Sequence, residues 1–149
     1  MVHIPSKDAP LERLDVWSGI LHGVNNKDYT VLRGIEVKPQ GGTPERAGYC
    51  PPPDKLGQRV LHETFYFPSN KKLDWMDVYS GDQPGACVDS LRFHVKDKDD
   101  YFAAGGASGN QHVIITDHGL HELVGFDVTA ETRAGDPNPY ITQLSPHLK

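Results

Sequence analysis

The sequence predicts a single all-β domain, residues 1–149, and three observations support that prediction. The chain has 15 Gly, 12 Pro and 37% apolar residues, which is typical of a turn-rich β protein because the interiors of helices exclude both Gly and Pro. Apolar residues recur with the period of two that half-buried strands require. Turns that contain Gly separate these runs. With 149 residues, the chain is long enough to bury a sizeable core without a metal or a set of disulfides.

The first half of the chain combines one clear strand with turn-rich segments. Asp8 to Leu14 begins with an N-cap residue and has Pro near its start, so we expect one short helical turn there. Tyr29 to Val37 is the first clear strand. From Lys38 to Arg59, Pro and Gly recur too often for a sheet ladder or a helix. We therefore expect a long loop over residues 38–59.

The second half alternates apolar and polar residues in the manner of strands. Leu61, Phe65 and Phe67 share one face, and the charged run Lys96 to Asp100 fits a solvated hairpin turn. A last strand over residues 140–148 is interrupted by Pro146. Strands at this regular spacing favour a sandwich, barrel or prism of antiparallel sheets. The same alternation predicts inward-facing side chains at Leu91, Phe93, Val95, Val113, Ile115, Val124, Phe126 and Val128.

Charge and hydropathy exclude two classes of partner. The formal net charge is −5, and Lys and Arg do not cluster with aromatic residues, so we expect no nucleic-acid partner. No apolar run approaches the roughly 18 residues that span a bilayer, and the start of the chain lacks a hydrophobic signal core. We therefore expect no membrane span, and a protein that is cytoplasmic or non-classically secreted.

Cys50 and Cys87 leave two redox states open. A disulfide between them would close a loop and stabilise the fold by about 3 to 5 kcal/mol. A reducing compartment would instead keep two separate thiols.

Four short motifs follow one another in the second half of the chain: Val88-Asp-Ser-Leu-Arg-Phe, Gly105-Gly-Ala-Ser-Gly109, Leu123-Val-Gly-Phe126 and Tyr140-Ile-Thr-Gln-Leu144. Their order and spacing resemble the jacalin-related (mannose-binding-type) lectins, from Glu63 to the C-terminus. The resemblance implies a β-prism of three antiparallel sheets. It also implies reversible carbohydrate binding without catalysis and without a cofactor. Homo-oligomers are expected in such a lectin, because linked sites raise a weak single-site affinity.

The resemblance further implies a carbohydrate site in the loops at one end of the prism. The family's loop before the last strand corresponds here to Gly135 to Tyr140, and the family's mid-chain loop corresponds to Gly81 to Gly85. Polar side chains there would match sugar hydroxyls, and an aromatic ring would cover the flat apolar face of a pyranose. Judged without the family resemblance, the Asp-Pro and Asn-Pro pairs are ordinary turn formers, and Tyr140 is a half-buried aromatic residue of a strand. The expected sugar contacts are Gly135, Asp136, Asn138, Tyr140, Thr142, Asp82 and Gln83.

Thr142 departs from the family, whose binding loop normally carries an Asp at this position. A hydrogen bond to a charged group contributes about 1.5 to 3 kcal/mol, so a neutral Thr lowers the expected affinity. We hypothesise that Asp136, which lies between Pro and Gly in a longer loop, returns a carboxylate to the same space.

Two other functions stay open beside the lectin. The first is a protein-interaction or assembly module that has lost sugar binding and uses the Pro-rich segment 38–59. The second is a metal-dependent enzyme that uses His112, His118 and His121, because imidazole and carboxylate groups at close spacing can hold zinc. Their spacing matches no known metal-binding motif, and Asp117 to Gly119 is better explained as a turn. We therefore expect no metal and no catalytic residue.

Overall fold

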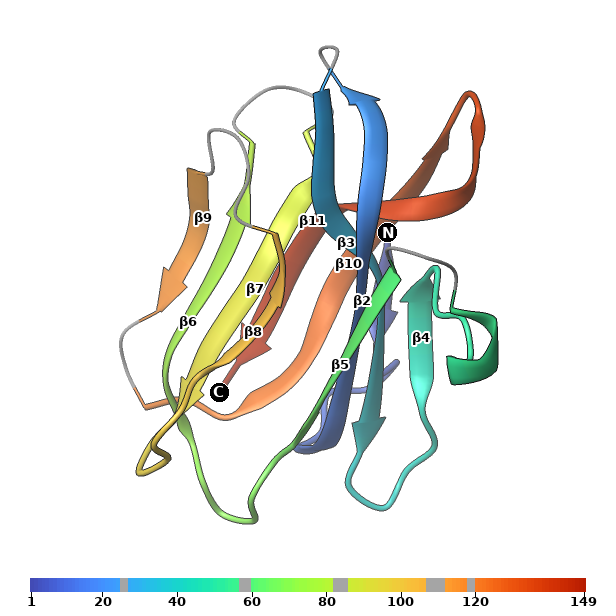
Figure 1. Cartoon of the computed structure of the whole chain (residues 1–149). Coiled ribbons are helices and arrows are strands. Elements are labelled where there is room, and N and C mark those ends of the chain that lie inside the picture. Colours follow the sequence, from blue (N-terminus) through green and yellow to red (C-terminus); the bar gives the residue numbers. More distant parts are fainter. Residues whose placement is uncertain (25–26, 57–59, 82–85, 107–111, 118–119) are drawn as a thin grey trace.

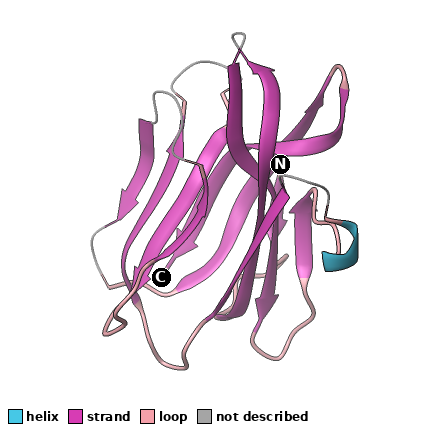
Figure 2. Cartoon of the chain, in the orientation of Figure 1, coloured by secondary structure: helices cyan, strands magenta, loops and turns pink. Residues whose placement is uncertain are grey.

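The computed structural model describes residues 1–24, 27–56, 60–81, 86–106, 112–117 and 120–149. Apart from one short 3-10 turn, the described residues form strands joined by loops, as Figure 2 shows. Among the described residues, no helix has the length and hydropathy that crossing a membrane requires. The elements are β1 (Val2–Ile4), β2 (Leu11–Val24), β3 (Lys27–Pro39), β4 (Glu45–Gly48), η1 (Pro53–Lys55), β5 (Val60–Tyr66), β6 (Leu73–Ser80), β7 (Val88–Val95), β8 (Phe102–Gly105), β9 (His112–Asp117), β10 (Leu123–Arg133) and β11 (Asp136–Leu148).

The strands form three antiparallel sheets (Figure 1). The first four-stranded sheet has the order β4-β3-β2-β5, and the second has the order β8-β7-β6-β9. In both, three consecutive strands are followed by a fourth that returns beside the first, which is the Greek-key order. The three-stranded sheet is β1-β10-β11, in which the N-terminal strand takes the place of the returning fourth strand. The all-β prediction and the three antiparallel sheets are therefore confirmed.

The core lies between the inner faces of the three sheets. Phe93 of β7 and Phe126 of β10 are both fully buried. The rings of Phe65, Phe67 and Phe102 surround Phe93 at centroid distances of 5.1, 5.7 and 4.9 Å. Because Phe65 belongs to β5 and Phe93 to β7, this cluster joins the two four-stranded sheets. The inward positions predicted at Leu91, Phe93, Val95, Val124, Phe126 and Val128 are all buried, whereas Val113 and Ile115 lie in β9 with side chains outside the described part.

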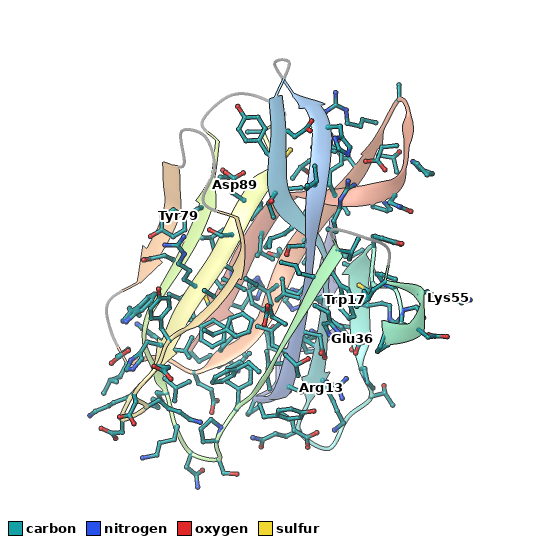
Figure 3. The ribbon with its side chains drawn as sticks, in the orientation of Figure 1. Arg13, Trp17, Glu36, Lys55, Tyr79 and Asp89 are labelled. Atoms are coloured by element: carbon teal, nitrogen blue, oxygen red, sulfur yellow. The ribbon has the colours of Figure 1, made fainter. Side chains whose placement is uncertain are left out.

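The outer face of the first four-stranded sheet carries buried charges. The Arg13 guanidinium donates to Asp15 at 2.7 Å and to Glu36 at 2.8 Å, and Figure 3 shows Arg13 and Glu36 beside Trp17 on this sheet. The Trp17 indole donates to the carbonyl oxygen of Pro51 at 3.0 Å. The Pro-rich segment after β4 therefore covers this face, because it accepts a hydrogen bond from a buried indole.

Two predictions about the first half of the chain are wrong. The expected helical turn at Asp8 to Leu14 is instead the approach to β2, which begins at Leu11. Leu11 and Leu14 are buried in the core, and pairing of β2 with both β3 and β5 outweighs the local N-cap signal. The predicted loop over residues 38–59 contains β4 and η1, because β4 pairs with the end of β3 from Gly34↔Gly48 to Val37↔Glu45.

Leu61 and Phe65 share one face of β5, as predicted, because they pair with Ser18 and Leu14 of β2, although Leu61 is 56% exposed on this edge strand. One prediction about the later strands is wrong in detail. Pro146 does not interrupt the last strand, because it pairs with Phe126 inside β11. β11 lies at the edge of its sheet, where a residue without an N–H group is tolerated. The predicted hairpin turn at Lys96 to Asp100 is confirmed between β7 and β8.

Phe93→Ala should destabilise the protein by about 3 to 5 kcal/mol, since it leaves a cavity where the two four-stranded sheets meet. Urea unfolding measures the change. Tyr66→Ala is the control, because Tyr66 is 67% exposed, and its free energy of unfolding should stay within about 0.5 kcal/mol of the original. An equal loss in the free energy of unfolding in the two variants would contradict the described core.

Candidate functional site

A cleft of about 480 Å³ lies between the first four-stranded sheet and the hairpin of β10 and β11. The β2–β3 and β10–β11 hairpins reach the same end of the molecule, at the top of Figure 1. The cleft therefore opens where two sheets meet at their ends. Its lining residues are Gly19, Ile20, His22, Arg33, Tyr49, Val60, Arg133, Ala134, Gly135, Asp136 and Asn138.

Arg33 holds the two sides of the cleft together. Arg33 is only 6% exposed to solvent. Nη1 donates to the carbonyl oxygens of Asn138 and Pro139 at 3.1 and 3.3 Å, and Nη2 donates to the carbonyl oxygen of Ile20 at 2.7 Å and to Asp136 Oδ2 at 2.8 Å. One buried guanidinium therefore ties β2 and β3 to the start of β11.

A break in strand register explains how a charged side chain of β3 reaches this position. Trp17 of β2 faces Gly34, but the next residue, Ser18, faces Leu32. Arg33 is thus the extra residue of a β-bulge, which re-aims a side chain relative to its strand neighbours. Bulges of this kind cannot be read from alternation alone.

The Asp136 carboxylate is the fixed anionic group of the cleft. Its Oδ1 accepts the backbone N–H of Asn138 at 3.0 Å, and its Oδ2 accepts from Arg33. Burial opposes ionisation of Asp136, but hydrogen bonds from Arg33 and Asn138 and the positive charges of Arg33 and His22 outweigh it, so the pKa of Asp136 is lowered. The side chain remains 21% exposed, so an ionised carboxylate faces the cleft at neutral pH.

The predicted sugar contacts separate into three groups. Gly135, Asp136 and Asn138 line the cleft together. Tyr140 and Thr142 do not line it: Tyr140 pairs with Glu131 inside the hairpin, and the Thr142 hydroxyl donates to the carbonyl oxygen of Thr129 at 3.3 Å. Asp82 and Gln83 lie outside the described residues.

The opposite wall of the cleft was not predicted from the sequence. Arg33, Tyr49 and His22 come from the first half of the chain, in which no family motif was found. One signal was present in the sequence, because Arg33 interrupts the apolar run of Tyr29 to Val37. A buried Arg in a strand needs a partner, but that partner lies 103 residues away.

The two cysteines are free, and both thiols are protonated at neutral pH. Burial raises the pKa of Cys50 to about 12 and that of Cys87 to about 11. A protonated thiol is a poor nucleophile. Neither residue therefore supplies the thiolate that cysteine catalysis needs.

The histidines considered for a metal enzyme are only partly described. The His121 backbone pairs with Leu73 through hydrogen bonds of 2.7 and 3.0 Å. His112 lies in β9 with its side chain outside the described part, and His118 is likewise outside it. The hypothesis of a metal-dependent enzyme at these three histidines therefore stays a prediction.

No family model matches the chain, and no curated protein matches it in sequence. Two solved structures are similar in fold. The crystal structure of PirB aligns with a TM-score of 0.61 and 15% identity over 98% of this chain and 30% of that chain. The insecticidal delta-endotoxin Cry8Ea1 from Bacillus thuringiensis aligns with a TM-score of 0.52 and 12% identity over 94% of this chain and 28% of that chain.

These similarities define a class of fold. The chain is an all-β protein of three antiparallel sheets, and it spans less than a third of each of the two larger chains. At identities of 15% and 12%, the similarity concerns the fold alone.

The ion pair of Arg33 and Asp136 should stabilise the fold at neutral pH and lose its contribution only in acid. Because the folded pKa of Asp136 lies below its ordinary value of 3.8, this contribution is present above that value and is lost as the pH falls through the folded pKa. Asp136→Asn should therefore lower the free energy of unfolding at neutral pH by about 3 kcal/mol. The difference in free energy of unfolding between the variant and the original protein should shrink as the pH falls below 3.8 and through the folded pKa of Asp136. Urea unfolding at neutral pH and in acid measures it, and a difference independent of pH would contradict the ion pair.

Proposed function

We propose that this protein binds carbohydrate reversibly, without catalysis, in the cleft between the β2–β3 and β10–β11 hairpins. The observation that carries the proposal is the Asp136 carboxylate, which is held by Arg33 and Asn138 and still exposed to the cleft. Each carboxylate oxygen accepts one hydrogen bond from the protein and has a second acceptor position. Two neighbouring sugar hydroxyls would take these positions.

The rest of the lining suits a sugar as well. The aromatic ring of Tyr49 supplies an apolar surface for the C–H face of a pyranose, and His22 and Asn138 supply further polar groups. The volume of about 480 Å³ lies within the range of about 300 to 1,000 Å³ that is typical of small-molecule sites. Because both terminal nitrogens of Arg33 already donate to four protein acceptors, we assign Arg33 a positioning role.

We also propose that the three sheets form a prism of the jacalin type. The same Greek-key order in both four-stranded sheets, and the shorter β1-β10-β11 sheet beside them, support this arrangement. In such a lectin, oligomers would raise the avidity of a weak site.

A glycan array tests the proposal. The original protein should bind a defined group of glycans, and Asp136→Ala should weaken that binding at least tenfold, because a hydrogen bond to a charged group is lost. Ala134→Trp should also weaken it. Ala134 is exposed at the cleft wall, so the larger side chain obstructs the cleft without breaking the ion pair.

Glu36→Ala is the matched control for Asp136→Ala. Glu36 is also a buried carboxylate paired with arginine, at 2.8 Å from Arg13 and 2.7 Å from Arg46, but it lies outside the cleft. Its loss should reduce stability and leave glycan binding unchanged. Glycan binding unaffected by both cleft variants, or no binding by the original protein, would refute the proposal.

A further inference from the structure

Four side chains on the outer face of the three-stranded sheet form a closed ring, which we call the His/Asp ring: His3, Asp8, Asp127 and His147. His3 Nδ1 lies 2.8 Å from Asp127 Oδ1, and His3 Nε2 lies 2.7 Å from Asp8 Oδ1. His147 Nε2 lies 2.8 Å from Asp127 Oδ2, and His147 Nδ1 lies 3.4 Å from Asp8 Oδ2. Each imidazole therefore stands between the same two carboxylates.

Strand register brings three of these residues together. His3 of β1 pairs directly with Asp127 of β10, and His147 of β11 pairs with Gly125, two residues before Asp127. Side chains two residues apart on a strand share a face. Phe126 is fully buried on the inner face, so Asp127 and the two histidines all point outward from three adjacent strands.

Asp8 comes from the loop between β1 and β2 and is held over the ring by backbone contacts. The N–H of Ala9 donates to the carbonyl oxygen of Val124 at 3.2 Å. A Cβ added at Gly125 would lie only 3.0 Å from Asp8 Oδ1 and 2.9 Å from the carbonyl oxygen of Ile4. The absence of a side chain at Gly125 therefore leaves room for the Asp8 carboxylate.

The two carboxylates face different nitrogen atoms of each ring. Asp127 faces His3 Nδ1 and His147 Nε2, whereas Asp8 faces His3 Nε2 and His147 Nδ1. When His3 Nε2 and His147 Nδ1 carry protons and donate to Asp8, the other two nitrogens, His3 Nδ1 and His147 Nε2, have lone pairs directed toward Asp127. A metal-ligating imidazole commonly donates its second N–H to a carboxylate in this manner.

We propose that the His/Asp ring is a site for a divalent transition-metal ion, with His3 Nδ1, His147 Nε2 and an Asp127 oxygen as ligands and Asp8 as the carboxylate that orients both imidazoles. One ligand atom from each of His3, Asp127 and His147 can be chosen so that all lie within 4.8 Å of one another. Ligand bonds of about 2.0 to 2.2 Å to a central ion require only a small adjustment of such a set.

The chemistry of the ligands selects the kind of ion. Two imidazole nitrogens and one carboxylate oxygen suit zinc and its first-row neighbours, whereas calcium and magnesium prefer oxygen ligands alone. With neutral imidazoles the ring has a formal charge of −2 from its two carboxylates, which a divalent ion balances. The four side chains are about 30% exposed, so water completes the coordination.

An ion at this position would fasten the N-terminal strand. β1 has only three residues and pairs only with β10 among the described strands. A metal bound to β1, β10 and β11 would link all three strands of this sheet. The His/Asp ring is separate from the cleft, because Asp127 and Arg133 lie six residues apart on β10, which is roughly 20 Å along a strand.

Calorimetric titration of tag-free protein with ZnCl2 tests this proposal. The original protein should bind one zinc ion per chain and unfold at a higher temperature with zinc, because the ion binds only the folded ring. His147→Ala and Asp127→Asn should abolish this binding. Asp8→Asn, which alters only the orienting carboxylate, should weaken it about 10- to 100-fold.

His94→Ala is the matched control. His94 Nδ1 also lies 2.7 Å from a carboxylate, that of Asp74, but this pair belongs to the second four-stranded sheet and not to the His/Asp ring. Zinc affinity should be unchanged in this variant. Circular dichroism without zinc checks that every variant is folded, and Gly125→Ala, which crowds Asp8, should weaken binding with the three ligands intact.

Two results would overturn the proposal. One is no zinc binding by the original protein at neutral pH. The other is equal zinc affinity in the original protein and in folded Asp127→Asn or Asp8→Asn. Titration with CaCl2 and MgCl2 should give no binding at the ring, and tighter binding of either ion than of zinc would contradict the ligand assignment.

Discussion

Strand register is the constraint on which the rest of this structure depends. Each sheet buries one face against a shared core, so a shift of one residue would exchange every inner side chain with an outer one. Phe126 is fully buried while its neighbour Asp127 faces outward in contact with two histidines. The pairing that packs the core therefore also fixes the positions of the polar groups on the outer faces.

The residues of the proposed cleft site lie where this regular pattern is broken or left uncovered. Arg33 reaches the cleft because a bulge in β3 removes it from the alternation of its neighbours. Thr142 occupies a similar break in β11, where Thr129 faces Gln143 and Ala130 faces Ile141. Its hydroxyl donates to the carbonyl oxygen of Thr129, and the carboxylate that faces the cleft belongs to Asp136, near the turn.

The sequence predicts local features well and distant partners poorly. Alternation predicted the burial of Phe93 and Phe126, because a two-residue period is visible within one strand. The N-cap and Pro at the start of Asp8 to Leu14 favoured a helix, but pairing with two distant strands decided the outcome. The Arg33–Asp136 pair spans 103 residues and the His3–Asp127 pair spans 124, so neither leaves a local pattern.

The β10–β11 hairpin relates the two proposed sites. Its turn contributes Gly135, Asp136 and Asn138 to the cleft, and its open end contributes Asp127 and His147 to the His/Asp ring. The strand register contains bulges between these ends, at Thr129/Ala130 and Glu131/Arg133. Bulges absorb local adjustments of a strand, so movement of His147 onto an ion need not displace Asp136, which Arg33 holds independently from β3. The geometry therefore favours independent action of the proposed ion site and the proposed carbohydrate cleft.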